Sequence, residues 1–265
     1  MSFHTIRSGS FEYLTADAIS APHCFTTRFG GVSTGSLASL NLGIHRGDDP
    51  ENVRENYRIL GDAVGFRPEE LVLSHQTHTD IVLRVGTDEQ GAGLFGPELP
   101  ECDGLITATP GVGLAVFTAD CTPILLHDPV TGAVGAAHAG WRGTAAGIAA
   151  KTAEAMCREF GCHPENIHAA IGPNIGFCCF ETDRDVPDAM LAALGKGAAP
   201  HIRRVGEKFR VDLKAINRLW LERAGIIHID VSTDCTACRP DRFWSHRITR
   251  GDRGSQSAII ICREG

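Results

Sequence analysis

The chain has 265 residues, 43% of them hydrophobic and 22% charged, which is typical of a globular protein that buries a sizeable core. Its net charge of −7 and pI near 5.9 exclude the global basic field that would attract nucleic acid or membrane lipid. No apolar run reaches the roughly 20 residues of a membrane-spanning helix, and the N-terminus lacks the pattern of a signal peptide.

In the first third of the chain, short strand-like runs alternate with helical spacing. Residues 23–43 begin as a strand and continue into a Gly/Ser-rich loop. Residues 49–66 carry apolar side chains at helical intervals and predict an amphipathic helix. Residues 71–85 predict two strands around a polar centre, which contains His75 and His78.

The middle of the chain predicts three short strands and a long helix. The strands are expected over residues 113–120, 123–128 and 133–139, with a turn signal between the last two. Residues 144–161 predict one helix, with Thr144 as its N-cap and Gly161 as its end.

The last third continues the same alternation. Strands leading into loops are expected over 166–181 and 228–238, helices over 185–197 and 212–226, and a final strand near residue 257. No linker, low-complexity tract or repeat interrupts the chain. We therefore expect a single α/β domain over residues 1–265.

Ten cysteines are too few for a disulfide scaffold in a chain of this length. Without a secretory signal most should be reduced thiols, so we expect a cytoplasmic protein. A single cysteine is usually a small buried hydrophobe, and only cysteines in a chemical pattern become candidates for metal binding or catalysis. Two further pairs are predicted to be structural or loop cysteines. Cys235 and Cys238 form a CxxC motif, but no second CxxC motif accompanies it. Cys178 and Cys179 are adjacent, and adjacent residues of a strand face opposite ways.

Cys121 and His138 form the strongest chemical pattern. Cys121 follows Asp120 at the end of one apolar run, and His138 closes the next run before a glycine turn. Strand ends that lead into helices are where α/β proteins place ligands. The small residues around His138 leave room for its imidazole. Either His75 or His78 is expected to join this pair, since an odd spacing in an extended strand places them on opposite faces.

Two chemistries fit a thiolate beside imidazoles. In a nucleophile pair the histidine lowers the pKa of the thiol. In a zinc site one thiolate and two neutral imidazoles leave a fourth position open, which is the arrangement of catalytic zinc. One cysteine with two histidines favours the metal.

Two arginines are candidates for binding an anion. Arg142 lies just before the predicted helix at Thr144, where free N–H groups and the helix dipole favour phosphate. Arg28 precedes a glycine-rich loop that could hold a phosphate or a ribose, and Asn41 at the end of that segment is a further candidate for substrate binding. Asp120 is expected to orient a metal ligand, a water or the substrate.

Six segments in fixed order resemble one known family. They read FTTRFGGVSTGSLASLNLG, LSHQTHTDIV, ECDGLITATPGVGLAVFTADCTPILLHDP, GAAHAGWRGTAAGI, AAIGPNIGFCCFE and FWSHR. Together they resemble the YfiH/laccase-domain family, whose members are regarded as purine nucleoside phosphorylases and were formerly regarded as polyphenol oxidases. The resemblance runs from about Cys24 to Ile261, and its ADCTP…HAGWRG core is highly specific.

This resemblance implies a fold, a site and an activity. The fold is a single-domain α/β/β/α sandwich with mixed β-sheets. The site is a zinc ion on His78 (rather than His75), Cys121 and His138. We expect Arg142, chosen above as a candidate for binding an anion, at the same catalytic site. The activity is phosphorolysis of adenosine, inosine and related nucleosides, including methylthioadenosine, together with adenosine deamination. The partners are then purine nucleosides and phosphate, and the chain is expected to be a monomer or a small homo-oligomer.

The chain departs from the family near its C-terminus, where Ser255 stands at a position that is often arginine, and substrate preference or rate then depends on what replaces it. Two alternatives remain open. A copper-dependent phenol oxidase needs several coppers and many histidine ligands, and the sequence assembles only one such site. A Cys–His hydrolase would use Cys121 as nucleophile and His138 as base.

Overall fold

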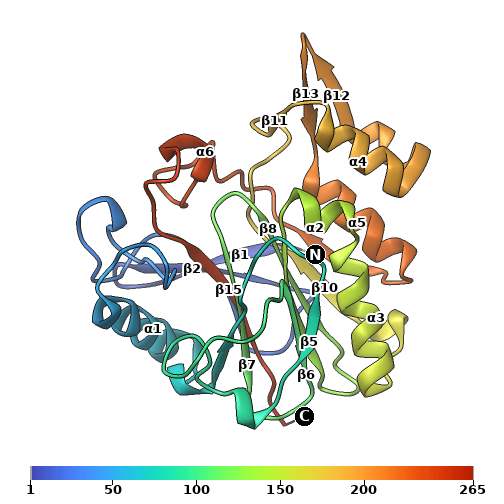
Figure 1. The fold of residues 1–265 in the computed structure, drawn as a ribbon. Coiled ribbons are helices and arrows are strands. Elements are labelled where there is room, and N and C mark those ends of the chain that lie inside the picture. Colours follow the sequence, from blue (N-terminus) through green and yellow to red (C-terminus); the bar gives the residue numbers. More distant parts are fainter. Residues whose placement is uncertain (1, 265) are drawn as a thin grey trace.

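Two mixed β-sheets pack face to face, and helices cover the outer face of each sheet (Figure 1). The computed structural model describes residues 2–264. The mixed α/β sandwich expected from the sequence is confirmed. The predicted domain limits, residues 1 and 265, lie outside the described residues.

The first sheet has six strands and combines the two ends of the chain. Its order is β1 (Phe3–Ser8), β2 (Phe11–Ala16), β3 (His23–Thr26), β15 (Gln256–Ile261), β7 (Gly113–Thr118) and β4 (Leu71–Leu73). Only the β4–β7 pair is parallel. The last strand of the chain therefore lies in the interior of the sheet, between β3 and β7.

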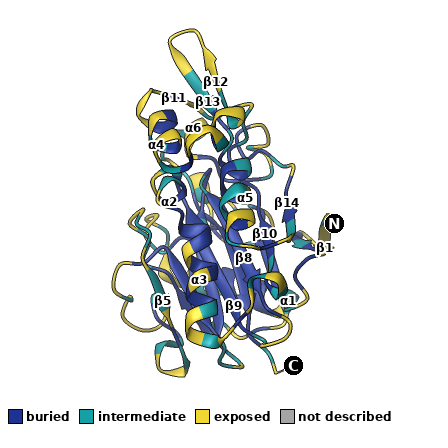
Figure 2. Ribbon diagram, turned by 90° about the vertical axis from the view of Figure 1, so that its right-hand side faces the viewer, coloured by how far each residue is buried: buried dark blue, intermediate teal, exposed yellow. Residues whose placement is uncertain are grey.

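The second sheet also has six strands. Its order is β14 (His228–Val231), β10 (His168–Ile171), β8 (Thr122–His127), β9 (Val134–Ala139), β6 (Gly104–Thr107) and β5 (Val82–Arg84). The β10–β14 and β5–β6 pairs are parallel, and the others are antiparallel. All of β8 and β9 is buried, which explains why these strands are continuous apolar runs (Figure 2).

Helices pack on the outer apolar face of each sheet. On the first sheet lies α1 (Pro50–Val64); on the second lie α3 (Ile148–Phe160) and α5 (Leu213–Arg223). Beyond the sheet ends lie α2 (Trp141–Ala145), α4 (Asp185–Leu194), α6 (His246–Thr249) and a small sheet of β11 (Glu181–Thr182), β13 (Lys208–Val211) and β12 (Ile202–Val205). No described helix has the length and apolar character needed to cross a membrane.

Alternating side chains divide the core into layers. In β15, Ala258 and Ile260 pack between the two sheets, whereas Ile259 and Ile261 pack under α1. In β8, Leu125 faces the first sheet and its neighbours on either side face α3. Because both faces of these strands are covered, a shift of one residue would exchange one packed layer for another, so the register is strongly specified.

One predicted element is wrong. The helix expected over residues 144–161 is two helices, because Gly147 has φ +77° and ends α2 before α3 starts. Thr144 lies inside α2 rather than at its start, where Gly140 is the N-cap. The predicted end at Gly161 is confirmed, since this residue caps α3 in the left-handed conformation at φ +70°.

Candidate metal centre

Three side chains from three different segments converge at one end of the sandwich. His78 comes from the turn after β4, Cys121 from the connection between β7 and β8, and His138 from the C-terminal end of strand β9. One ligand atom from each lies within 4.8 Å of the other two. The two imidazole rings meet edge to face, with centroids 4.9 Å apart. The three predicted ligands are therefore brought together.

The turn that carries His78 is held in an uncommon conformation. His78 has φ +64°, a left-handed geometry that is costly for a residue with a side chain. Gln76 fixes this turn to β7, because its side-chain amide donates to the carbonyl of Phe117 at 2.8 Å and accepts from the N–H of the same residue at 2.6 Å. Strain held by surrounding contacts is frequent at functional sites.

His75 lies on the same turn but is not part of the triad. Its Nδ1 lies 2.9 Å from the carbonyl oxygen of Leu99, and its other ring nitrogen is 3.6 Å from Glu98. Residues 74–79 form a turn rather than an extended strand, so the opposite-face argument does not apply to them. The conformation of the turn separates the two histidines instead.

Asp103 organises the centre from behind. Its carboxylate lies 2.6 Å from Nδ1 of His138, and both side chains are buried. The same carboxylate accepts hydrogen bonds from the N–H groups of Thr77, His78 and Thr79. A carboxylate on one ring nitrogen fixes the tautomer and leaves the other nitrogen free to bind metal. One buried acid thus orients both histidine ligands.

The electrostatics of the three side chains describe the centre before a metal binds. Burial lowers the pKa of His138, but the Cys121 thiolate and the bond to Asp103 outweigh burial and raise that pKa to about 9. Burial and repulsion from His138 lower the pKa of His78, which keeps this imidazole neutral. Burial raises the pKa of Asp103, yet its bonds to His138 and Thr79 bring the pKa below its ordinary value. Protons and a metal ion would compete for this site.

Gly140 provides the space that the triad needs. A Cβ atom at this position would lie 2.4 Å from Nδ1 of His78 and 3.4 Å from Sγ of Cys121. Its φ of −65° is ordinary for any residue, so space rather than backbone conformation requires glycine here. Glycine at the start of α2 therefore lets the turn after β4 approach β9.

The triad lies where two hollows meet. The first hollow is polar and opens beside β7, and the second has a volume of about 390 Å³, within the range of small-molecule sites. Both are lined by Arg46, His78, Ala119, Cys121 and Arg253. The second hollow adds the aromatic and aliphatic side chains of Trp141, Ile175, Phe180 and Leu213. A ligand with a planar apolar part and an anionic part would fit this pair.

Of the residues predicted to bind substrate, Asp120 lines a hollow and Arg142 does not. Asp120 lines the second hollow, where its carboxylate accepts from the hydroxyl of Thr236 and the N–H of Arg247, and its φ is +86°. Arg142 is exposed and stacks on Trp141, 4.2 Å from the ring centroid. Arg142 is thus beside the hollows rather than among their lining residues.

Arg28 and Asn41 do not line the hollows. Arg28 stacks on Trp244 and donates to the carbonyls of Pro240 and Ala38. Asn41 is fully buried, and its amide binds Gly43 and Ser255 behind the wall of the first hollow. These two side chains support loops rather than line the cavity.

Arg253 and Arg46 are the residues that the sequence argument missed. Burial and the nearby Arg46 lower the pKa of Arg253 to about 10, which still leaves it charged at neutral pH. Arg253 donates to the hydroxyl of Ser255 at 3.1 Å, and its Nε is buried without a partner in the described part of the chain. The signal in the sequence that could have identified Arg253 is its position two residues before Ser255, where the family resemblance leads us to expect an arginine.

Comparison with known proteins places this site in a family. The family model described as "Multi-copper polyphenol oxidoreductase laccase" matches residues 22–263. The chain is 41% identical over 244 residues to "Purine nucleoside phosphorylase YlmD" of Geobacillus stearothermophilus, covering 90% of this chain and 89% of the relative. It is 38% identical over 224 residues to "Purine nucleoside phosphorylase YfiH" of Escherichia coli, covering 84% and 87%.

Solved structures agree. The crystal structure of YlmD from Geobacillus stearothermophilus has a TM-score of 0.92 at 38% identity, covering 98% of this chain and 99% of the other. The Bacillus licheniformis protein YfiH has a TM-score of 0.93 at 34% identity, with the same coverage. The expected resemblance is confirmed: the chain belongs to the YfiH/laccase-domain family, whose relatives carry the name purine nucleoside phosphorylase.

Proposed function

We propose that the protein is a zinc-dependent purine nucleoside phosphorylase whose metal is held by His78, Cys121 and His138. The observation that carries the metal assignment is the donor set. One thiolate and two imidazoles converge, and Asp103 bonds to the His138 ring and to the backbone N–H of His78. The lack of a side chain at Gly140 leaves room for the His78 ring. These residues fit zinc with one position left open.

The two hollows suggest how a nucleoside and phosphate would be bound. The purine ring would lie in the second hollow against Trp141 and Phe180, because aromatic side chains bind planar rings by stacking. Arg46 and Arg253 line both hollows and would bind phosphate, because guanidinium groups match phosphate oxygens bidentately. Nucleoside and phosphate would then meet at the triad.

In phosphorolysis a phosphate oxygen bonds to C1′ of the ribose as the bond from C1′ to the purine nitrogen breaks. The products are a ribose 1-phosphate and the free base, which takes up a proton. The reaction depends on placing phosphate against C1′ and on stabilising the charge that develops there, which this chain would do through the two arginines. A bound zinc ion would supply a Lewis acid beside them.

We include adenosine, inosine and methylthioadenosine among the proposed substrates, and adenosine deamination as a second activity. In deamination, water replaces the amino group at C6 and ammonia leaves. Asp120 lines the second hollow and would hold a polar group of the substrate there. We also propose that the protein acts in the cytoplasm, as its ten free thiols favour.

The decisive experiment supplies adenosine or inosine to the purified protein with and without phosphate, while the metal content is measured. We expect free base to appear only with phosphate, and Cys121→Ala to lose both the zinc ion of the triad and the activity. Cys157→Ala, on α3 away from the triad, is the matched control and should keep both. Activity that persists after complete zinc removal would overturn the metal mechanism, and phenol oxidation restored by copper alone would point to the oxidase instead.

A cysteine nucleophile is the second candidate, and one observation favours it. Asp103, His138 and Cys121 lie in the order of an acid–base–nucleophile triad, with Asp103 2.6 Å from His138. His78 would have no function in such a triad, yet it reaches the same point. A covalent acyl-enzyme on Cys121 in metal-free protein would establish this alternative over the phosphorylase.

A further inference from the structure

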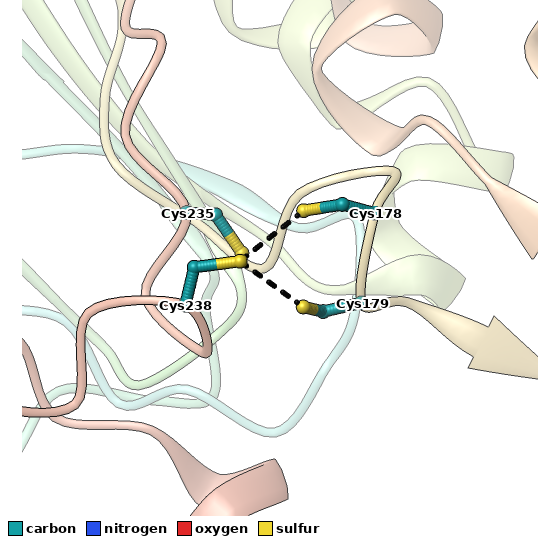
Figure 3. A group of neighbouring side chains, drawn as sticks. All are labelled: Cys178, Cys179, Cys235 and Cys238. Carbon is teal, nitrogen blue, oxygen red and sulfur yellow. Dashed lines mark hydrogen bonds between the residues drawn. The ribbon is translucent and has the colours of Figure 1, made fainter.

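Four cysteines from two distant loops meet beyond the edge of the second sheet, outside the triad (Figure 3). Cys178 and Cys179 lie between β10 and β11, and Cys235 and Cys238 lie in the loop after β14. Because β10 and β14 are parallel neighbours, the loops that follow them leave the sheet at the same end. All four sulfur atoms lie within 4.8 Å of one another.

This cluster differs from what the sequence predicts. Cys178 and Cys179 would face opposite ways in a strand, but here they lie in a turn, and both thiols point toward Cys238 (Figure 3). Their sulfur atoms are 3.5 and 3.4 Å from that of Cys238. The adjacent pair therefore supplies the second half of a four-cysteine set that the CxxC motif alone lacks.

The sulfur spacing suits a tetrahedral metal. Zinc–sulfur bonds of about 2.3 Å place the corners of a tetrahedron about 3.8 Å apart. The observed sulfur distances are close to this value, and Cys235 and Cys238 have the spacing of a zinc knuckle. Little movement would bring the four sulfur atoms to the corners of such a site.

The surrounding backbone holds the two loops together. The N–H of Gly176 donates to Sγ of Cys235 at 3.1 Å, and the N–H of Thr236 donates to the carbonyl of Asn174 at 2.9 Å. A Cβ atom on Gly176 would lie 3.2 Å from Sγ of Cys178 and 3.1 Å from Cβ of Cys235, so glycine lets the loops approach. Protein contacts thus bring the thiols near one another before any metal binds.

A buried cation balances the charge. Four thiolates around a divalent metal leave a net charge of −2, which is costly away from water unless it is compensated. Lys214 is only 8% exposed, and its ammonium donates to the carbonyls of Ser232 and Asp234, next to Cys235. Burial lowers the pKa of Lys214 to about 8, while the charges of Asp212, Cys235, Asp234 and Cys178 act in the opposite direction. The Lys214 ammonium would help to balance an anionic metal cluster at this place.

We propose that Cys178, Cys179, Cys235 and Cys238 bind a second zinc ion, which has a structural role. Four protein ligands fill the coordination sphere and leave no position for substrate, as in other structural zinc sites. This assignment rests on the cluster alone and stands whichever reaction the triad performs.

The second zinc would stabilise the wall of the second hollow. Ile175 and Phe180, which line that hollow, flank the cysteine turn. Arg247 lines it as well and donates to the carbonyls of Cys179 and Glu181. Linking the two loops through a metal would hold these side chains against the substrate, so loss of the zinc should weaken substrate binding more than turnover.

The test is the zinc stoichiometry of the full-length protein, purified anaerobically with reductant and zinc and then freed of unbound metal. We expect two zinc ions per chain. The Cys235→Ser/Cys238→Ser variant should keep one, and His78→Ala/Cys121→Ala should also keep one. Cys157→Ser, outside both groups, should keep two. Because the two double variants lose different ions, failure of the cluster and failure of the triad give different results.

Cobalt substitution identifies the ligands. With the triad removed, the remaining cobalt should show the strong thiolate charge-transfer absorption of a four-sulfur site, and this absorption should weaken when Cys178→Ser is added. Cys178 is exposed, so this single change is tolerated if the double variant does not fold. A zinc content that the Cys235→Ser/Cys238→Ser change does not lower, or a disulfide between Cys238 and Cys178 or Cys179 under these anaerobic conditions, would overturn the proposal.

Discussion

Gly140 determines whether His78 and Cys121 can share a ligand. The position tolerates alanine by its backbone angles but not by its surroundings, because the added carbon would overlap the ring of His78. A glycine before a helix is often explained by conformational freedom, yet here it is explained by contact between two loops. Substitution of Gly140 should therefore affect metal binding much more than the stability of the fold.

Gly140→Ala should reduce zinc affinity at the triad by about 10- to 100-fold, as loss of ligand orientation does. The unfolding temperature of the metal-free protein should change by only a few degrees. A zinc titration with a chromophoric chelator measures the affinity, and a thermal melt measures the unfolding temperature. Gly86→Ala is the control, since a Cβ there meets nothing closer than 3.8 Å. Unchanged zinc affinity in Gly140→Ala would show that His78 is not a ligand.

Arg253 is buried beside Arg46, and its Nε has no hydrogen-bond partner among the described residues, so it brings positive charge to the cavity. Ser255, which stands where relatives are expected to carry arginine, holds Arg253 through its hydroxyl. An arginine two residues before Ser255 thus lines the same hollow as Ser255. A hydrogen bond thus links Arg253 and Ser255 on the wall of the first hollow.

Arg253→Gln should raise the KM for phosphate by about tenfold or more and the KM for the nucleoside much less, since a charge-assisted bond to a phosphate is removed. Steady-state kinetics with each substrate varied in turn measures both constants. Arg218→Gln on the exposed face of α5 serves as the control. A larger effect on the nucleoside would place the phosphate elsewhere.

At the scale of elements, three neighbouring strands of the second sheet each carry a histidine at the same level. His168 on β10 is paired in register with His127 on β8 and with His228 on β14. The rings of His168 and His228 are 4.5 Å apart. These histidines are far apart in sequence and show no ligand spacing, so only strand pairing brings them together.

This row makes the sheet sensitive to acid. Burial and repulsion from His168 lower the pKa of His127 to about 4. Its folded pKa is below the unfolded value of about 6.5, so the stabilisation is fully present above pH 6.5 and is lost as the pH falls toward 4.

His127→Gln should flatten the pH dependence of the unfolding free energy between pH 6.5 and 4 by about 1 kcal/mol, after allowance for solvent screening. Urea unfolding at several pH values measures this pH dependence. His163→Gln, an exposed position, should leave the slope unchanged. An equally steep slope in His127→Gln would assign the acid sensitivity to other groups.

Elements with a strong apolar period could be predicted from the sequence. The helix α1 and the buried strands β7, β8 and β9 appear where the pattern places them. The hairpin of β1 and β2 carries no comparable signal, because most of β1 is exposed. The break at Gly147 was missed because one glycine among alanines barely disturbs a helical pattern, whereas packing against Trp220 decides its conformation.

The site was predictable only in part. The residue chemistry of Cys121 and His138 marked a metal or a nucleophile, but the choice of His78 came from family resemblance. Asp103 and Arg253 depend on long-range pairing: one is 35 residues from the histidine that it orients, and the other precedes the last strand. A single sequence carries no local mark of such contacts.

At the scale of the whole molecule, the triad joins the two sheets. His78 follows a strand of the first sheet, His138 ends a strand of the second, and Cys121 lies where the chain crosses between them. A metal bound to all three would stabilise the sandwich through the folded state alone, because the unfolded chain does not hold the ligands together.

Free zinc at about 100 times its dissociation constant should add about 2.7 kcal/mol to the unfolding free energy, which raises the unfolding temperature by several degrees. Thermal melts with and without a chelator measure this shift. Magnesium, which prefers oxygen ligands, should produce none. In His78→Ala the part of the shift that belongs to the triad should disappear. A shift of equal size in that variant would contradict the assignment.

The interior position of β15 has a consequence for when the site can form. Until residues 256–261 pair, β3 has no neighbour on that side and the pair of β7 and β4 is detached from the rest of the first sheet. Arg253 reaches the cavity from the segment just before that strand. The chain must therefore be synthesised through residue 261 before this pocket can close, so we expect a metal ion to be held firmly at the triad only after β15 has paired.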